Sequence, residues 1–274
     1  MENIRNSGEI GEKELLAVSF GTSYPKNRRQ TIGAIEDALE QAFPDWSVRR
    51  AFTSKKVIAN IKKKENLSID SLAEALERAK ENGVKQLVLQ PTLMMDGIEY
   101  QELLAQVQKE QQAFERLTVG RPLLDEEADF RQIVQILTEQ TGQYEDGKTA
   151  ICFMGHGTTV KANCVYEKLQ QMLFDCGYRN YLIGTVEAEP NLTQLRKKVK
   201  DAGYARVILQ PLMIVAGDHA NHDMAGDGED SWKSAFEADG CEVVCILKGL
   251  GEIPMIQNLF VAHAKRAIEN GSLQ

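Results

Sequence analysis

The stretches Val88-Leu89-Gln90-Pro91 and Ile208-Leu209-Gln210-Pro211 read as one strand ending written twice. Each is an apolar run that stops at a Gln-Pro pair. Each is followed, at the same spacing, by a glycine and then by an ionisable side chain, which is Glu99 in the first copy and His219 in the second. Repetition of so large a unit predicts two similar halves. Each half should carry a reactive group in a loop that follows a strand.

A second repeat joins Val18-Ser19-Phe20-Gly21-Thr22-Ser23 to Met154-Gly155-His156-Gly157-Thr158-Thr159 and places Phe20 opposite His156. The runs before both glycine-containing loops are continuously apolar, which is typical of parallel strands buried on both faces. Strands that alternate with helices specify open parallel sheets. The expected fold is therefore α/β, with two similar Rossmann-like lobes, each a parallel sheet flanked by helices, and an active-site cleft between them.

The elements expected from periodicity and turn residues alternate along the whole chain. Strands are predicted at residues 15–20, 46–52, 86–90, 116–119, 149–154, 181–186, 206–215 and 242–247. A helix is predicted at residues 25–43, and helical patterns follow the strand at 46–52 up to about residue 82. Further helices are predicted at residues 99–113, 126–141, 161–177, 190–202, 229–238 and 252–269. A polar linker at residues 143–148 predicts an N-terminal lobe of residues 1–145 and a C-terminal lobe of residues 146–274.

Composition narrows the class of partner. The net charge of -8 argues against nucleic acid, because neutralising phosphates requires a basic surface. No run reaches the roughly 20 apolar residues that span a bilayer, and no apolar segment follows the first charged residues as in a secretory signal. The five cysteines are odd in number and scattered, as expected for reduced thiols. The expectation is a cytoplasmic protein without a membrane partner.

Three ionisable side chains follow strands of the second half: His156, Glu187 and His219. In an open parallel sheet, ligands bind beyond the carboxyl ends of the strands. Two imidazoles and a carboxylate that converge there form a divalent-metal set. Alternatives remain open at this point: His156 alone suits a tight turn, and the three residues can belong to independent loops.

His222, three residues after His219, is a conceivable further ligand. The nearby acidic residues are expected to be solvated loop charges, which also attract cations; they are Asp218, Asp223, Asp227, Glu229 and Asp230.

Several runs spread over residues 15–267 resemble the anaerobic cobalt chelatases of the CbiK type, in the class II chelatase family. The runs that carry the resemblance include Ser19-Phe20-Gly21-Thr22-Ser23, Arg50-Ala51-Phe52-Thr53-Ser54, Phe153-Met154-Gly155-His156-Gly157, Thr185-Val186-Glu187, Pro211-Leu212-Met213-Ile214-Val215-Ala216-Gly217-Asp218-His219-Ala220, Asp223-Met224-Ala225, Glu229-Asp230-Ser231-Trp232-Lys233 and Gly249-Leu250-Gly251-Glu252. The resemblance implies a nucleotide-independent lyase with two Rossmann-like lobes that hold a tetrapyrrole.

The resemblance also implies roles for individual residues. His156 matches the histidine that accepts pyrrole protons and binds cobalt, and Glu187 and His219 match the other metal-binding residues. Glu99 matches an active-site glutamate on the opposite lobe. The chain departs from the family at Leu93, where a histidine is frequent, so no metal delivery or metal choice by that side chain is expected.

The activity implied is sirohydrochlorin cobaltochelatase: insertion of Co2+ into sirohydrochlorin, or precorrin-2, in anaerobic cobalamin biosynthesis. The partners are then the tetrapyrrole and the ion, with no organic cofactor, and homo-oligomer formation is left open. Fe2+ or Ni2+ as the metal is an alternative, because histidine and carboxylate ligands scarcely discriminate among these ions. A tetrapyrrole or metal carrier without turnover is a third interpretation.

Overall fold

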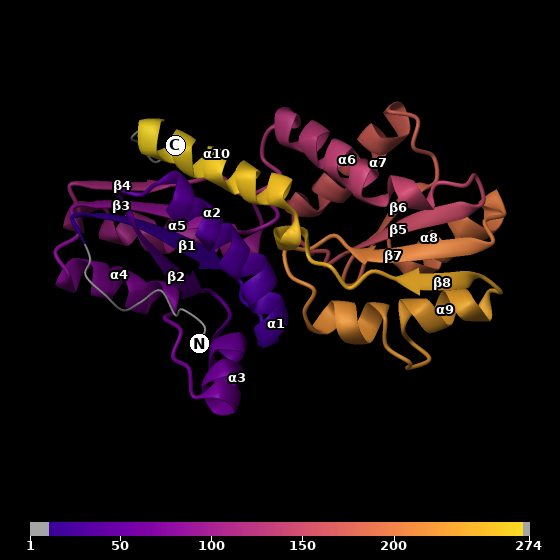
Figure 1. Ribbon diagram of the computed structural model, residues 1–274, viewed down its shortest axis with the longest axis horizontal. Helices are drawn as coiled ribbons and strands as arrows, with labels where there is room; N and C mark the ends of the chain where they lie inside the picture. Colours follow the sequence, from indigo (N-terminus) through magenta and orange to yellow (C-terminus); the bar gives the residue numbers. More distant parts are fainter. Residues whose placement is uncertain (1–10, 271–274) are drawn as a thin grey trace. The chain divides into compact units, whose positions relative to one another are not determined.

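The computed structural model describes residues 11–270 of the chain (Figure 1). The chain forms two compact units. The first contains the residues up to Asp125 and those from Gly251 onward, and the second contains Glu126–Leu250. Each unit holds one four-stranded sheet in which every pair of neighbouring strands is parallel. The two parallel sheets flanked by helices confirm the fold class expected from the sequence.

The first unit has the strand order β2-β1-β3-β4. Its strands are β1 (Lys13–Ser19), β2 (Ser47–Phe52), β3 (Gln86–Pro91) and β4 (Arg116–Val119). Its α-helices are α1 (Pro25–Arg28), α2 (Ala34–Ala42), α3 (Lys55–Glu65), α4 (Leu72–Glu81), α5 (Ile98–Glu110) and α10 (Pro254–Asn270). The apolar side chains of α4 and α5 form one core cluster with β1 and β3, whereas α2 and α10 contact each other and the sheet separately from that cluster.

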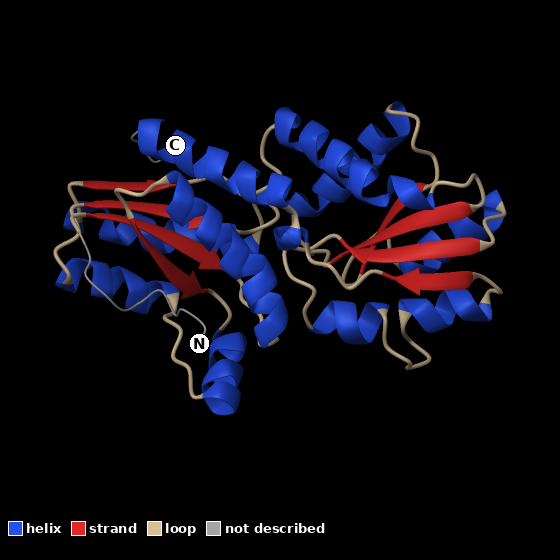
Figure 2. Ribbon diagram, viewed as in Figure 1, coloured by secondary structure: helices blue, strands red, loops and turns tan. Residues whose placement is uncertain are grey.

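The second unit has the equivalent strand order, β6-β5-β7-β8. Its strands are β5 (Thr149–Gly155), β6 (Tyr181–Thr185), β7 (Arg206–Pro211) and β8 (Glu242–Cys245). Its α-helices are α6 (Glu127–Thr141), α7 (Cys164–Asp175), α8 (Leu192–Ala202) and α9 (Trp232–Ala238). Helices α8 and α9 share a core cluster with β5, β6 and β7, and α6 packs against α7 (Figure 2).

The sequence repeat is also a repeat of strand register. Val18 of β1 pairs with Pro91 of β3, and Met154 of β5 pairs with Pro211 of β7. In both units the N–H of the residue after the proline donates to the strand partner, with N···O distances of 2.8 Å. The two halves therefore have equivalent strand ends, and the loops that follow start from equivalent positions.

The expected elements differ from the observed ones at two places. A π-helical segment at Arg29–Gly33 interrupts the helix predicted over residues 25–43. The strand predicted over residues 206–215 ends at Pro211, after which the N–H of Leu212 still donates to Met154 of β5. The apolar residues that follow are buried or half-buried in a loop, so hydrophobicity continues past the end of the strand.

The boundary expected at residue 145 is replaced by two crossings of the chain between units, after Asp125 and before Gly251. Helix α6 belongs to the second unit because it packs on α7, and the hydroxyl of Thr141 donates to that of Tyr181 in β6 at 3.0 Å. Helix α10 belongs to the first unit because it packs on α2, β3 and β4. Among the described helices, none has both the length and the apolarity needed to cross a membrane.

One acidic residue of the first unit is buried at the start of β1. Glu14 is 3% exposed. Burial raises its pKa from 4.5 to about 7, with Asp70 adding to the shift and with Arg49 and Arg78 opposing it. The unfolded carboxyl ionises above pH 4.5, whereas the folded one stays neutral until about pH 7. The stability contributed by Glu14 is therefore complete below pH 4.5 and is lost as pH rises through about 7. At 1.36 kcal/mol per pKa unit, that loss is about 3 kcal/mol.

Glu14→Gln is expected to remove this loss, because the amide does not ionise. At pH 8 the variant should be more stable than the parent by roughly 2–3 kcal/mol, and near pH 4 the two should be equally stable. Urea unfolding across this pH range measures the difference. Glu12→Gln, at an exposed neighbouring position, should leave the pH dependence unchanged. Parallel pH profiles for the parent and Glu14→Gln would contradict the assignment.

Candidate metal centre

His156 follows β5 between two glycines that the packing requires. A β-carbon at Gly155 would lie 2.3 Å from Cε1 of Tyr166, which packs from α7. Gly157 has φ of +85°, and a β-carbon there would lie 2.9 Å from the backbone nitrogen of Ala188. The Tyr166 hydroxyl also accepts the N–H of Gly157 at 3.3 Å. The backbone around His156 is thus held between a helix and the loop after β6.

Glu187 lies in that loop after β6. Its N–H donates to the carbonyl of His156 at 2.9 Å, and the N–H of Val186 donates to the carbonyl of Gly155 at 3.1 Å. The Thr185 hydroxyl closes the loop by donating to the carbonyl of Ala188 at 2.6 Å. Main-chain hydrogen bonds therefore tie the Glu187 loop directly to the His156 loop.

His219 follows β7 after a buried loop. Gly249 lets the chain approach this loop closely, since a β-carbon there would lie 2.5 Å from the carbonyl oxygen of Ile214. The side-chain amide of Asn221 donates to the carbonyl oxygens of Ala216 and Gly217 at 3.2 and 2.7 Å. A π-helical segment, Ala220–Met224, begins immediately after His219. These contacts fix the backbone position of His219, from which its imidazole extends.

The three side chains predicted from the sequence converge at this edge of the second sheet. One donor atom each from His156, Glu187 and His219 lies within 4.8 Å of the others. His156 Nε2 is 3.8 Å from Glu187 Oε1, too long for a hydrogen bond, and the two imidazole rings meet edge to face with centroids 4.8 Å apart. Donor atoms that share a cation at about 2.1 Å each are separated by roughly 3.4–4.2 Å. Small side-chain movements are enough for the three to hold one ion.

The protons on the two imidazoles follow from their partners. His156 Nδ1 lies 2.9 Å from the carbonyl oxygen of Gly157, and His219 Nδ1 lies 2.5 Å from Oδ2 of Asp223. A carbonyl or carboxylate oxygen accepts, so in each neutral ring the proton is assigned to Nδ1. Each Nε2 then has a free lone pair for a metal or a proton. The side chains are accessible, with 44% of His156, 34% of His219 and 56% of Glu187 exposed.

The other residues singled out by the sequence lie elsewhere. Glu99 is in the first unit, in the first turn of α5, and its role remains a prediction. His222 is 69% exposed and pairs with Asp218 at 3.0 Å, outside the converging set. Leu93 is buried, at 8% exposure, as an apolar core residue. Sequence reasoning missed the specific contact of Asp223 with His219, although their spacing of four residues in one helical turn was the available signal.

Gly157→Ala is expected to weaken divalent-cation binding strongly, because the new methyl would push apart the His156 and Glu187 loops. Positive φ adds strain, so stability should fall by about 1–3 kcal/mol. Titration with Co2+ and urea unfolding measure the two effects. Gly177→Ala is the matched control, since Gly177 has φ of +93° but nothing within 4 Å of a β-carbon. It should lose stability through strain and retain cation affinity. Equal affinities for the two variants would contradict the loop contact.

Comparison with known proteins identifies the family of the chain. A family model described as cobalt chelatase (CbiK) matches residues 13–269. A sirohydrochlorin cobaltochelatase of Salmonella typhimurium is 37% identical over 257 residues, which cover 94% of this chain and 97% of that protein. Sirohydrochlorin cobaltochelatase CbiKC of Nitratidesulfovibrio vulgaris is 29% identical over 262 residues, covering 94% and 91%.

The fold likeness extends to a solved structure. SirB from Bacillus subtilis with Fe3+ superposes with a TM-score of 0.63 at 13% identity, over 94% of this chain and 96% of that one. At this level of identity the likeness concerns the fold alone. The family match spans both units, with their two equivalent parallel sheets and the three convergent donors. The chain therefore belongs to the CbiK cobalt chelatase family.

Proposed function

We propose that this protein is a sirohydrochlorin cobaltochelatase that inserts Co2+ into sirohydrochlorin at the edge of the second sheet. The observation that carries the proposal is the convergence of His156, Glu187 and His219, with one donor atom from each within 4.8 Å of the others. Family membership and the names of the two relatives support the choice of substrate.

The reaction exchanges two protons for one ion. The divalent cation loses its water shell and bonds to four macrocycle nitrogens, and two pyrrole N–H groups release their protons. The lone pair on His156 Nε2 serves first as a metal ligand and then as an acceptor for a pyrrole proton, since imidazole exchanges protons near neutral pH. Glu187 neutralises charge on the bound ion, and His219 holds it while the macrocycle nitrogens take over.

The ligand types suit an ion that must be released. A closed cage of thiolates retains a cation, as in structural zinc sites. Two imidazoles and one carboxylate leave coordination positions open for water or for the incoming macrocycle. The exposed side chains of His156 and Glu187 are compatible with a large flat substrate that reaches the ion from outside the sheet edge.

We further propose that Glu99 takes part in the reaction as a second proton acceptor. Its position matches that of His219 in the repeat, two residues beyond the equivalent glycine. Glu99→Gln should slow insertion and leave Co2+ binding to the protein alone unchanged. A normal rate in Glu99→Gln would remove this residue from the mechanism and leave the metal centre of the second unit intact.

The test is anaerobic incubation of the purified protein with excess sirohydrochlorin and Co2+, followed by the absorbance change of the metallated product. Many turnovers per protein molecule are expected, and a single stoichiometric binding event would instead indicate a carrier. Parallel reactions with Fe2+ and Ni2+ identify the preferred ion. A faster rate with either would replace cobalt in the proposal and retain the chelatase chemistry.

A further inference from the structure

The two histidines of the metal centre have different partners at Nδ1. His156 donates to a backbone carbonyl, which is neutral, whereas His219 donates to the carboxylate of Asp223, at a distance of 2.5 Å. A carboxylate behind a metal-ligating imidazole fixes the tautomer and the ring orientation, and it raises the basicity of the free nitrogen. The Nε2 of His219 should therefore be the stronger metal donor of the pair.

The backbone around Asp223 is held firmly enough to aim its carboxylate. Asp223 lies in the π-helical segment, between Ala220 and Met224, whose side chains are both fully buried. At the start of the segment, Asn221 bonds back to two carbonyls of the preceding loop. The segment thus places a half-exposed carboxylate, 45% accessible, beside the imidazole four residues earlier.

We propose that Asp223 is a positioning residue that makes His219 the anchoring ligand of the metal centre. This inference rests on the proposed function. With His219 held as the stronger donor, His156 is the ligand that releases the ion first. The division of roles follows from which acceptor each Nδ1 faces.

The chain contains a matched control for this contact. Asp218 and His222 form a second carboxylate–imidazole pair with the same spacing of four residues, at 3.0 Å. Their side chains are 77% and 69% exposed, and His222 lies outside the converging donors. Asp218→Asn removes the same charge as Asp223→Asn, from a position just before the π-helical segment. Each variant therefore loses one negative charge near the proposed ion, and the two differ in which imidazole the carboxylate contacts.

The experiment measures Co2+ binding to the protein without tetrapyrrole, by titrating the visible absorption of the bound ion. Asp223→Asn is expected to raise the Kd about 10- to 100-fold and to alter the absorption band, and Asp223→Ala should do at least as much. Asp218→Asn should stay within about twofold of the parent, because Asp218 is exposed and pairs with His222, which lies outside the converging donors. In the insertion assay, the KM for Co2+ should rise in Asp223→Asn by more than kcat falls.

A double-mutant cycle separates positioning from a structural role. In a His219→Ala background, Asp223→Asn should have no further effect on Kd, because the carboxylate acts through that imidazole. His219→Ala should also weaken Co2+ binding more than His156→Ala does. If Asp223→Asn and Asp218→Asn bind Co2+ alike while His219→Ala binds weakly, the inference is overturned and the metal centre stands. If His219→Ala binds like the parent, the metal centre itself is wrong.

Discussion

Replacing His156 by alanine is expected to lower kcat/KM for Co2+ insertion by about 10²- to 10⁴-fold, the range for loss of a general base. The variant loses both a metal ligand and the Nε2 lone pair that faces Glu187 at 3.8 Å. The measurement is the initial rate of product absorbance at several Co2+ concentrations. Comparing the effect on kcat with the effect on Co2+ affinity separates the proton-accepting role from the ligand role.

The control for His156→Ala is His222→Ala, which removes an exposed imidazole from the π-helical segment Ala220–Met224, outside the converging donors. Its rate should equal that of the parent. If both variants retain the parental rate, His156 is neither base nor ligand, and the mechanism proposed for this sheet edge is excluded. If both lose activity alike, the loss is not specific to the converging donors, and His156 has no distinct role.

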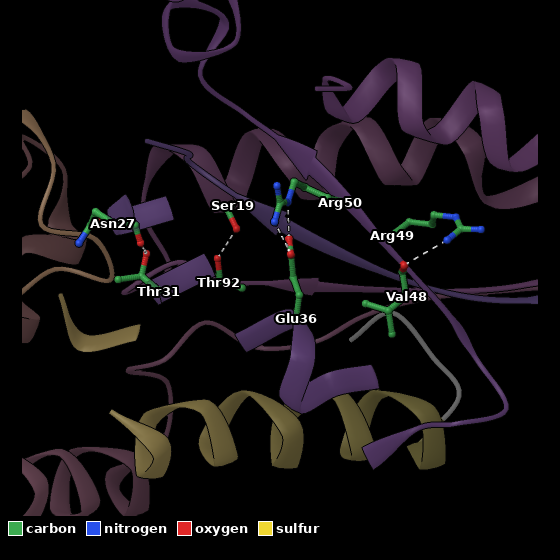
Figure 3. A network of polar contacts seen from close by, with 8 residues as sticks. All are labelled: Ser19, Asn27, Thr31, Glu36, Val48, Arg49, Arg50 and Thr92. Carbon is green, nitrogen blue, oxygen red and sulfur yellow. Dashed lines mark hydrogen bonds and ion pairs between the residues drawn. The ribbon is translucent and has the colours of Figure 1, made fainter. Parts of the chain in front are cut away.

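The second large effect concerns stability and lies in the first unit. Arg50 of β2 and Glu36 of α2 form a buried bidentate ion pair, with N···O distances of 2.7 and 2.6 Å and side-chain exposures of 2% and 0% (Figure 3). Arg50→Met is expected to reduce the free energy of unfolding by about 3–5 kcal/mol, because it leaves a carboxylate buried without its partner. Urea unfolding measures the change, provided that the m-value is unchanged.

Two further variants test the cause of this loss. Glu36→Leu combined with Arg50→Met should recover most of the stability, since replacing a buried pair by apolar side chains is often neutral. Arg131→Met breaks an exposed pair with Glu127, in which the side chains are 72% and 61% exposed, and should leave the urea midpoint nearly unchanged. A parental midpoint for Arg50→Met alone would show that the pair contributes nothing to stability.

The two similar lobes could be predicted from local patterns, whereas their shared strand order comes from the structure. Continuous apolar runs that alternate with helical periodicity specify parallel sheets, and the repeated Gln-Pro endings indicate two copies. The sequence favoured convergence of His156, Glu187 and His219 over independent loops, and the structure confirms it. Their loops follow β5, β6 and β7, and β5 lies between the other two, so the three carboxyl ends meet at one edge.

Other features depended on contacts between distant segments. Helix α6 belongs to the second unit because it packs on α7, and helix α10 belongs to the first unit because it packs on α2, β3 and β4. A polar linker at residues 143–148 carries no information about these contacts. The π-helical segment Arg29–Gly33 likewise interrupts the helical period that the sequence pattern continued over residues 25–43.

The sequence by itself determined that two imidazoles and an acid follow the ends of three strands, because the end of an apolar run and the residues after it are local properties of the chain. Only the tertiary structure decided which nitrogen of each ring is free. That choice depends on whether Nδ1 meets the Gly157 carbonyl or the Asp223 carboxylate. A hydrogen bond forms only within about 3 Å and within a narrow range of angles, so it requires the folded backbone to set its geometry.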